Sequence, residues 1–166
     1  GALISDINQP ILLVVPQGKS EEAVTRLARV GYDNTLGYLK GGIEAWIASG
    51  KTTDQITSIS AEEFSAKIKE DKLHVLDVRK DGEYNSMHLK MEGLQHFALD
   101  YSNQQMDQID AKKTYHIHCA GGYRSVIAAS ILKARGFHKI IDISGGFAAL
   151  KKTDASMSEF VCPSTL

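Results

Sequence analysis

Short apolar runs alternate with amphipathic stretches along most of this chain. The runs typical of buried strands cover residues 11–15, 73–78, 115–118 and 139–143. Apolar residues at helical spacing mark helices over 20–30, 60–70 and 124–135. Ser60 and Glu63 have the spacing of a capping box at the start of the second helix. Short strands that alternate with helices predict an α/β fold, in which a parallel sheet is covered by helices on both faces.

The order of predicted elements occurs twice. Residues 11–46 and residues 115–150 both read as strand, glycine-containing loop, helix, strand, Gly-Gly pair and short helix. We expect Pro16 to occupy in the first copy the position that Cys119 has in the second, in a loop about two residues shorter. Because the first copy lacks both the cysteine and a closing arginine, it is predicted to be non-catalytic.

The repeat suggests how the chain is divided. We expect a partial, degenerate repeat over residues 1–51, a polar linker over 52–58, a complete catalytic domain over 59–153, and a tail over 154–166. The partial repeat has little apolar material for a core of its own. We therefore expect it to pack against the complete domain or against another chain, and a homo-oligomer is one such arrangement.

Composition and charge narrow the functional classes. The 166 residues carry a net charge of −1, which gives no electrostatic reason to expect nucleic acid or a membrane surface as a partner. No apolar run approaches the roughly 20 residues that span a bilayer. Cys119 and Cys162 lie far apart in sequence and do not suggest a disulfide framework. A reactive thiol indicates a reducing compartment, so we expect a cytoplasmic location.

Residues 118–125, His-Cys-Ala-Gly-Gly-Tyr-Arg-Ser, carry the strongest chemical signal. Cys119 follows a predicted strand, and Gly121 and Gly122 let the backbone curl so that several N–H groups point at one anionic atom. The N-terminus of the next helix and the cation of Arg124 also favour negative charge. We therefore expect the pKa of Cys119 to lie below its free value of about 8.5, as in nucleophilic cysteines.

The other loop residues have supporting roles. Arg124 is expected to bind an anionic group of a substrate. Ala120 and Tyr123 would form the rim of the pocket, and Tyr123 would select substrate or simply pack. Ser125 would donate a hydrogen bond to the thiolate or cap the helix. Cys162 lies in the tail and is interpreted as inert, with a second thiol that resolves a persulfide as the alternative.

The loop from Cys119 to Arg124 resembles the active-site loop of the rhodanese family of sulfurtransferases, which runs from cysteine to arginine in six residues. Cysteine-dependent phosphatases carry a related loop with one more residue, which fits phosphate. Other segments resemble further parts of the family between about residues 56 and 152: Leu76-Asp77-Val78-Arg79, Glu83-Tyr84, His88-Leu89 and Gly145-Gly146. The likeness is greatest to the last rhodanese domain of proteins that begin with a metallo-β-lactamase domain.

The resemblance implies a rhodanese-like sheet and a sulfurtransferase. Cys119 would take a sulfane sulfur from thiosulfate or a low-molecular-weight persulfide and pass it to a thiol or to cyanide. No metal and no organic cofactor is expected. The substrate would be bound by the loop, residues Ala120, Gly121, Gly122, Tyr123, Arg124 and Ser125. Asp77 and Arg79 would support the floor of the site as an ion pair, and a metallo-β-lactamase domain would precede this region in the full-length protein.

Two alternatives stay open. The first is a cysteine-dependent phosphatase, which the short loop disfavours. The second is a docking module within a larger sulfur-metabolising protein, a role that the degenerate repeat could add to catalysis.

Overall fold

A computed structural model of the chain describes residues 4, 6–70 and 72–162. The chain forms two compact units, which divide between Gln55 and Ile56. In the part of the chain that is described, no helix is long and apolar enough to cross a bilayer.

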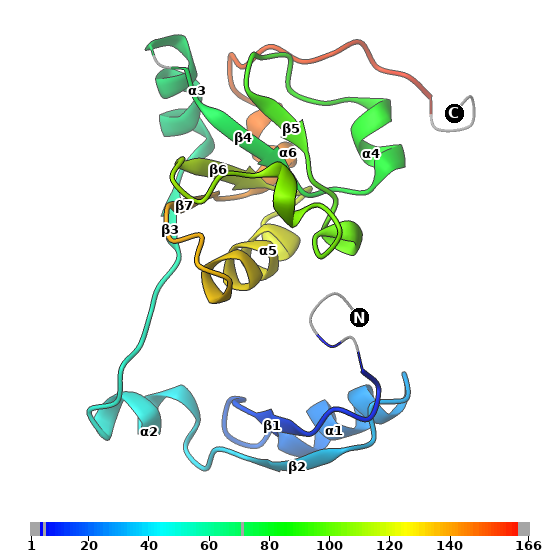
Figure 1. Cartoon of the computed structure of the whole chain (residues 1–166), viewed down its shortest axis with the longest axis vertical. Coiled ribbons are helices and arrows are strands. Elements are labelled where there is room, and N and C mark those ends of the chain that lie inside the picture. Colours follow the sequence, from blue (N-terminus) through cyan, green and yellow to red (C-terminus); the bar gives the residue numbers. More distant parts are fainter. Residues whose placement is uncertain (1–3, 5, 71, 163–166) are drawn as a thin grey trace. The chain divides into compact units, whose positions relative to one another are not determined.

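The second unit is built on a five-stranded parallel sheet (Figure 1). Its strands, in spatial order, are β3 (Thr57–Ile59), β7 (Ile140–Ile143), β6 (Tyr115–His118), β4 (His74–Asp77) and β5 (Leu94–His96). The central strand β6 is buried throughout. The sheet confirms the α/β fold with a parallel sheet flanked by helices.

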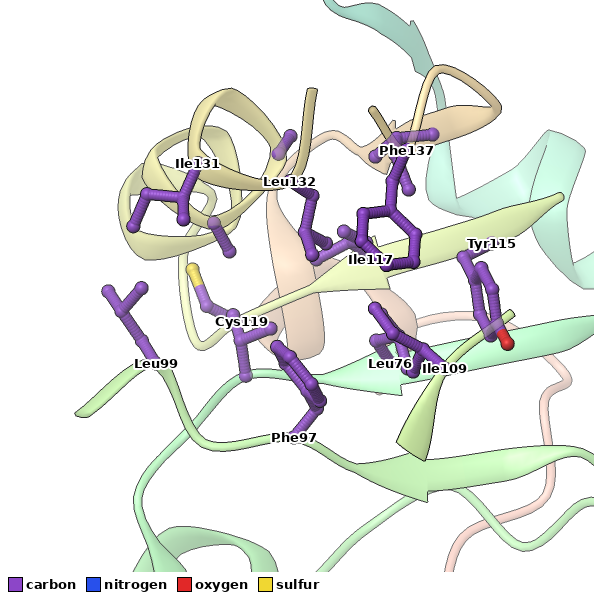
Figure 2. Close-up of a cluster of buried hydrophobic side chains, with 14 residues drawn as sticks. Leu76, Phe97, Leu99, Ile109, Tyr115, Ile117, Cys119, Ile131, Leu132 and Phe137 are labelled. Atoms are coloured by element: carbon purple, nitrogen blue, oxygen red, sulfur yellow. The ribbon is translucent and has the colours of Figure 1, made fainter. Parts of the chain in front are cut away.

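Two apolar clusters cover the two faces of this sheet. On one face α5 (Tyr123–Ala134) packs over β6 and β7, and Leu76, Ile117 and Leu132 meet in a cluster that Figure 2 shows in close-up. The opposite face carries α3 (Ala61–Glu70) and α6 (Gly146–Leu150). Adjacent strand residues enter opposite clusters because side chains alternate across a strand.

Local sequence signals place the main helices well. At the start of α3, the Glu63 N–H donates to Ser60 Oγ at 3.1 Å, and the Ser60 N–H donates to Glu63 Oε2 at 2.8 Å. The predicted capping box is therefore present. The helix α4 (Asp81–Ser86) follows β4, and two short 3₁₀ turns, η1 (Leu99–Tyr101) and η2 (Met106–Gln108), follow β5.

Two strands lie where the sequence predicts none. The segment 52–58, predicted as a linker, includes the first two residues of β3. β3 is a polar edge strand that is ordered through its pairing with β7, about eighty residues away. β5 pairs with β4 in the same way. Neither short strand has an apolar run of its own, so only the distant partner shows where it lies.

The tail is also paired. Leu89 and Met157 form an antiparallel bridge, and the Val161 N–H donates to the Ser86 carbonyl at 2.8 Å. Figure 1 shows this segment in red passing α4. Residues 155–162 thus run antiparallel to residues 86–90, whereas residues 163–166 of the predicted tail lie outside the described part.

The first unit repeats the order of β6, α5, β7 and α6. It consists of β1 (Ile11–Leu13), α1 (Ser20–Ala28), β2 (Thr35–Tyr38) and α2 (Gly42–Ala48), and β1 pairs with β2 in parallel. Of its described residues, only Gly42 is buried.

A glycine pair shows which residues of the two units correspond. Gly145 and Gly146 have φ of +75° and +56°, and Gly41 and Gly42 have φ of +82° and +63°. A Cβ on Gly146 would lie 2.4 Å from the Cys119 carbonyl oxygen. The same atom on Gly42 would lie 3.0 Å from the carbonyl oxygen of Val15.

Val15, and not Pro16, therefore has the position of Cys119, so the predicted match is wrong by one residue. The predicted difference in loop length is wrong too. Gly18 lies three residues after Val15, as Gly122 lies three residues after Cys119, and both have positive φ. Val15 extends the apolar run and reads as strand, whereas Pro16 reads as the first loop residue, which explains the shift.

Candidate active site

Cys119 is the residue that follows β6, at the carboxyl end of the central strand. The residue is only 1% exposed and belongs to the apolar cluster beneath α5 (Figure 2). The preceding residue, His118, faces the other side of the sheet, where its ring lies 6.0 Å from that of Phe147. Strand alternation thus separates the thiol from this imidazole.

The polypeptide after Cys119 turns back over the sulfur. The Gly122 N–H donates to Cys119 Sγ at 3.2 Å, and Ser125 Oγ lies 3.7 Å from the same sulfur. Gly122 has a φ of +101°, a left-handed conformation that glycine adopts without steric cost, and it is the N-cap of α5. The loop therefore places backbone donors and one hydroxyl around a single sulfur atom.

These donors determine the acidity of the thiol. Burial raises the pKa of Cys119. Hydrogen bonds from the Ser125 N–H and hydroxyl and from the N–H groups of Gly122 and Gly121 lower it by a larger amount, so the pKa lies below its ordinary value. The direction agrees with the sequence-based expectation. The chief donors are backbone amides and Ser125.

Arg124 is held mainly by a carboxylate. Its two terminal nitrogens contact the Glu83 carboxylate at 2.6 and 2.8 Å in a bidentate pair. This pair lowers the pKa of Glu83 and raises the pKa of Arg124, to which the charge of Cys119 adds a smaller contribution. Arg124, the cation that we expected to bind an anion, is thus already paired with Glu83, and this pair links the start of α5 to α4.

Glu83 is the site residue that the sequence did not assign. It lies 41 residues before Arg124, so no local spacing links the two side chains. The Glu83-Tyr84 motif was the available signal, but it suggested only a structural role.

Asp77 and Arg79 form the expected ion pair under the site. Arg79 Nε donates to Asp77 Oδ1 at 2.9 Å, and Arg79 Nη2 donates to the Met87 carbonyl at 2.8 Å. The guanidinium also lies 3.8 Å from the centre of the Phe147 ring. Burial lowers the pKa of His118, although Asp77, with Oδ2 3.7 Å from Nε2, raises it.

A pocket of about 660 Å³ opens next to the loop. It is lined by Arg79, Lys80, Gly82, Glu83, Ser86, Met87, Ala120, Phe147, Ala148, Lys151 and Phe160. Of the predicted rim residues, Ala120 lines this pocket. Tyr123 is not part of its lining and is 81% exposed. No three His, Cys, Asp or Glu side chains among the described residues are grouped as metal ligands would be.

Comparisons with known proteins agree with this architecture. The chain is 32% identical over 99 residues to the proposed sulfur carrier protein YrkF of Bacillus subtilis (strain 168). This match covers 59% of this chain and 52% of YrkF. It is 31% identical over 105 residues to the tRNA uridine(34) hydroxylase of Chlamydia trachomatis serovar L2, with 59% of this chain and 32% of the hydroxylase covered. The chain thus spans about half or less of the length of these relatives.

Solved structures match more than half of the chain. A rhodanese-like domain protein from Staphylococcus aureus superimposes with a TM-score of 0.55 at 25% identity, over 61% of this chain and 97% of that one. A rhodanese-related protein from Thermoplasma volcanium gives a TM-score of 0.54 at 24% identity, over 61% and 97% of the two chains, and supports the fold alone. The family model for the rhodanese-like domain matches residues 60–153, so the chain belongs to the rhodanese-like domain family.

Proposed function

We propose that the second unit is a sulfurtransferase that carries sulfane sulfur as a persulfide on Cys119. The observation that carries this proposal is the buried Cys119 sulfur, 3.2 Å from the Gly122 nitrogen, in a loop whose amides lower the thiol pKa. A thiolate stabilised by fixed backbone donors is both a nucleophile and a good carrier for a second, anionic sulfur. The family and the name of the Bacillus subtilis relative support a role in sulfur chemistry.

Loading would proceed by attack of the Cys119 thiolate on the outer sulfur of a donor. With thiosulfate, the new Cys119 S–S bond forms as the donor S–S bond breaks, and sulfite leaves with the electron pair. With an organic persulfide the leaving group is a thiolate. The loop amides from Ala120 through Arg124 would hold the outer, negatively charged sulfur.

Unloading would reverse this chemistry with a different nucleophile. A thiol, or cyanide in the test tube, attacks the outer sulfur, and Cys119 leaves as the thiolate that began the cycle. The sulfur changes carriers and no external oxidant or reductant is consumed. Neither half-reaction needs a metal or an organic cofactor.

The wider setting belongs to the same proposal. We expect transfer in the cytoplasm, within a longer protein that carries an N-terminal metallo-β-lactamase domain and uses the first unit for docking. The tRNA hydroxylases among the relatives show that similar domains also occur in another kind of enzyme, and their activity is not part of this proposal.

Steady-state kinetics with thiosulfate and cyanide test the function. We expect parallel double-reciprocal plots, which indicate a ping-pong mechanism, and loss of turnover in Cys119→Ser. Cys162→Ser is the control and should keep wild-type turnover. Hydrolysis of an aryl phosphate that depends on Cys119, without sulfur transfer, would instead support the phosphatase.

A further inference from the structure

The tail builds one wall of the pocket beside the catalytic loop. Its backbone is fixed by three hydrogen bonds of 2.8 Å to residues 86–90: Lys90 N–H to the Ser156 carbonyl, Ser158 N–H to that of His88, and Val161 N–H to that of Ser86. This pairing places Phe160 in the lining of the pocket, together with Phe147 and Ala120. The tail therefore contributes Phe160 to the pocket that Ala120, the residue after Cys119, also lines.

The pocket is large for an inorganic donor. Its volume of about 660 Å³ lies within the range of roughly 300–1,000 Å³ that is typical of sites for organic small molecules. Thiosulfate is only a few times larger than a water molecule, which takes about 30 Å³, so it would fill a small part of the pocket. Met87, Phe147 and Phe160 offer apolar contacts that thiosulfate cannot use.

The charges on the pocket wall favour an anion. The charges of Arg79 and Glu83 are matched by Asp77 and Arg124. Lys80 reaches the exposed Asp100 only at 3.7 Å. Lys151 makes no ion pair with any residue in the described part of the chain, and its Nζ lies 5.7 Å from the centre of the Phe147 ring. An uncompensated cation thus stands beside an apolar surface.

We propose that this pocket binds the organic part of a persulfide donor, with Lys151 paired to a carboxylate of the donor and Phe160 covering its carbon chain. This inference rests on the proposed function and names its substrate class as carboxylate-bearing organic persulfides. The pocket meets the loop at Ala120, the neighbour of Cys119, so a donor seated there presents its sulfur to the loop. Cys119 takes the outer sulfur, and the donor leaves as its thiolate.

The experiment compares two donors on the full chain. Rates of sulfur loading on Cys119 are followed by intact mass with glutathione persulfide, which carries carboxylates, and with the small persulfide of 2-mercaptoethanol, which carries none. We expect a clear preference for glutathione persulfide in the wild type. Lys151→Gln should reduce this preference about three- to fivefold, the size of one partly exposed ion pair. Phe160→Ala should reduce it about threefold, through lost apolar contact.

Two matched variants separate these effects from general damage. Lys152→Gln removes an exposed neighbouring charge outside the pocket and should keep the preference. Phe160→Leu keeps an apolar cover and should retain most of it. Loading by both donors without a preference, or a preference that survives both Lys151→Gln and Phe160→Ala, would overturn the inference while the sulfurtransferase stands. Failure of every donor to load folded protein would overturn the proposed function itself.

Discussion

At the scale of single residues, Cys119 combines two roles that are usually separate. It fills a core cluster, where burial disfavours a thiolate, and it accepts hydrogen bonds that favour one. The Cys-Ala-Gly-Gly sequence was enough to predict the second role, because glycines allow amides to converge on one atom. The partner of Arg124 was not predictable, since Glu83 is brought to it only by the folding of α4 against the loop.

The Ser125 hydroxyl should be needed for the acidity of Cys119. We expect Ser125→Ala to raise the Cys119 pKa, because a donor that lowers it is lost. Iodoacetamide alkylation against pH, in a Cys162→Ser background, measures this. A higher pKa leaves less thiolate at pH 7, so the Ser125→Ala variant should react more slowly there than the wild type. Ser130→Ala, on the exposed side of the same helix, is the control. Equal profiles for both variants would contradict this role.

The Glu83–Arg124 pair should stabilise the fold in a pH-dependent way. Glu83→Gln should lower the free energy of unfolding by about 1 kcal/mol at pH 7, the upper range for a partly exposed pair. The pKa of Glu83 is lower in the folded protein than in the unfolded chain. The stabilisation by this carboxylate is therefore fully present above the pKa of Glu83 in the unfolded chain, and it is lost as the pH falls through the pKa of Glu83 in the folded protein.

Urea denaturation at neutral and at acidic pH checks the Glu83 prediction. Glu92→Gln removes a pair with Lys72 whose side chains are 81% and 87% exposed, and it should change stability very little. A Glu83→Gln effect of the same size at both pH values would show that packing, and not charge, is responsible.

At the scale of elements, apolar runs and capping residues locate the buried strands and α3, whereas pairing between distant segments decides β3, β5 and the tail. The contact between α6 and the catalytic loop is one such pairing. The Phe147 N–H donates to the Cys119 carbonyl at 2.7 Å, directly after the left-handed Gly146. Only glycine fits at position 146, because a side chain there would meet the Cys119 carbonyl oxygen. The Gly-Gly motif marks this close contact in the sequence but does not show that the catalytic loop is the other side of it.

Gly146→Ala should damage the loop more than a change at another left-handed glycine. Its Cβ would lie 2.4 Å from the Cys119 carbonyl oxygen, whereas a Cβ on Gly136, with φ of +92°, would meet no atom within 4 Å. Both variants bear backbone strain of about 1–2 kcal/mol. Gly146→Ala should cost at least about 1 kcal/mol more in urea denaturation, through overpacking. Equal costs would show that the loop moves aside freely.

At the scale of the whole molecule, the first unit repeats the order of the last four elements of the second, β6, α5, β7 and α6, but has different chemistry. The first has Val15 where the second has Cys119, so it offers no thiol for sulfur transfer. The sequence revealed the repeat through its Gly-Gly pairs. The exact correspondence required backbone geometry, because the sequence alone does not show whether the last strand residue, Val15, or the first loop residue, Pro16, matches Cys119.

Removal of residues 1–50 should leave sulfur loading on Cys119 unchanged. The second unit contains both apolar clusters, the complete five-stranded sheet and all residues of the candidate site. Circular dichroism establishes that the remainder is folded, and intact mass measures loading. A folded remainder that no longer loads sulfur would show that the first unit shapes the site.

The central claim is that Cys119 carries the sulfur, and peptide-level mass spectrometry after incubation with thiosulfate or glutathione persulfide tests it most directly. We predict a gain of one sulfur on the peptide that contains Cys119, its loss on treatment with cyanide or a thiol, and its absence in Cys119→Ser but not in Cys162→Ser. Folded protein with a titratable Cys119 thiolate that gains no sulfur from either donor, or gains it on Cys162 alone, would contradict the account.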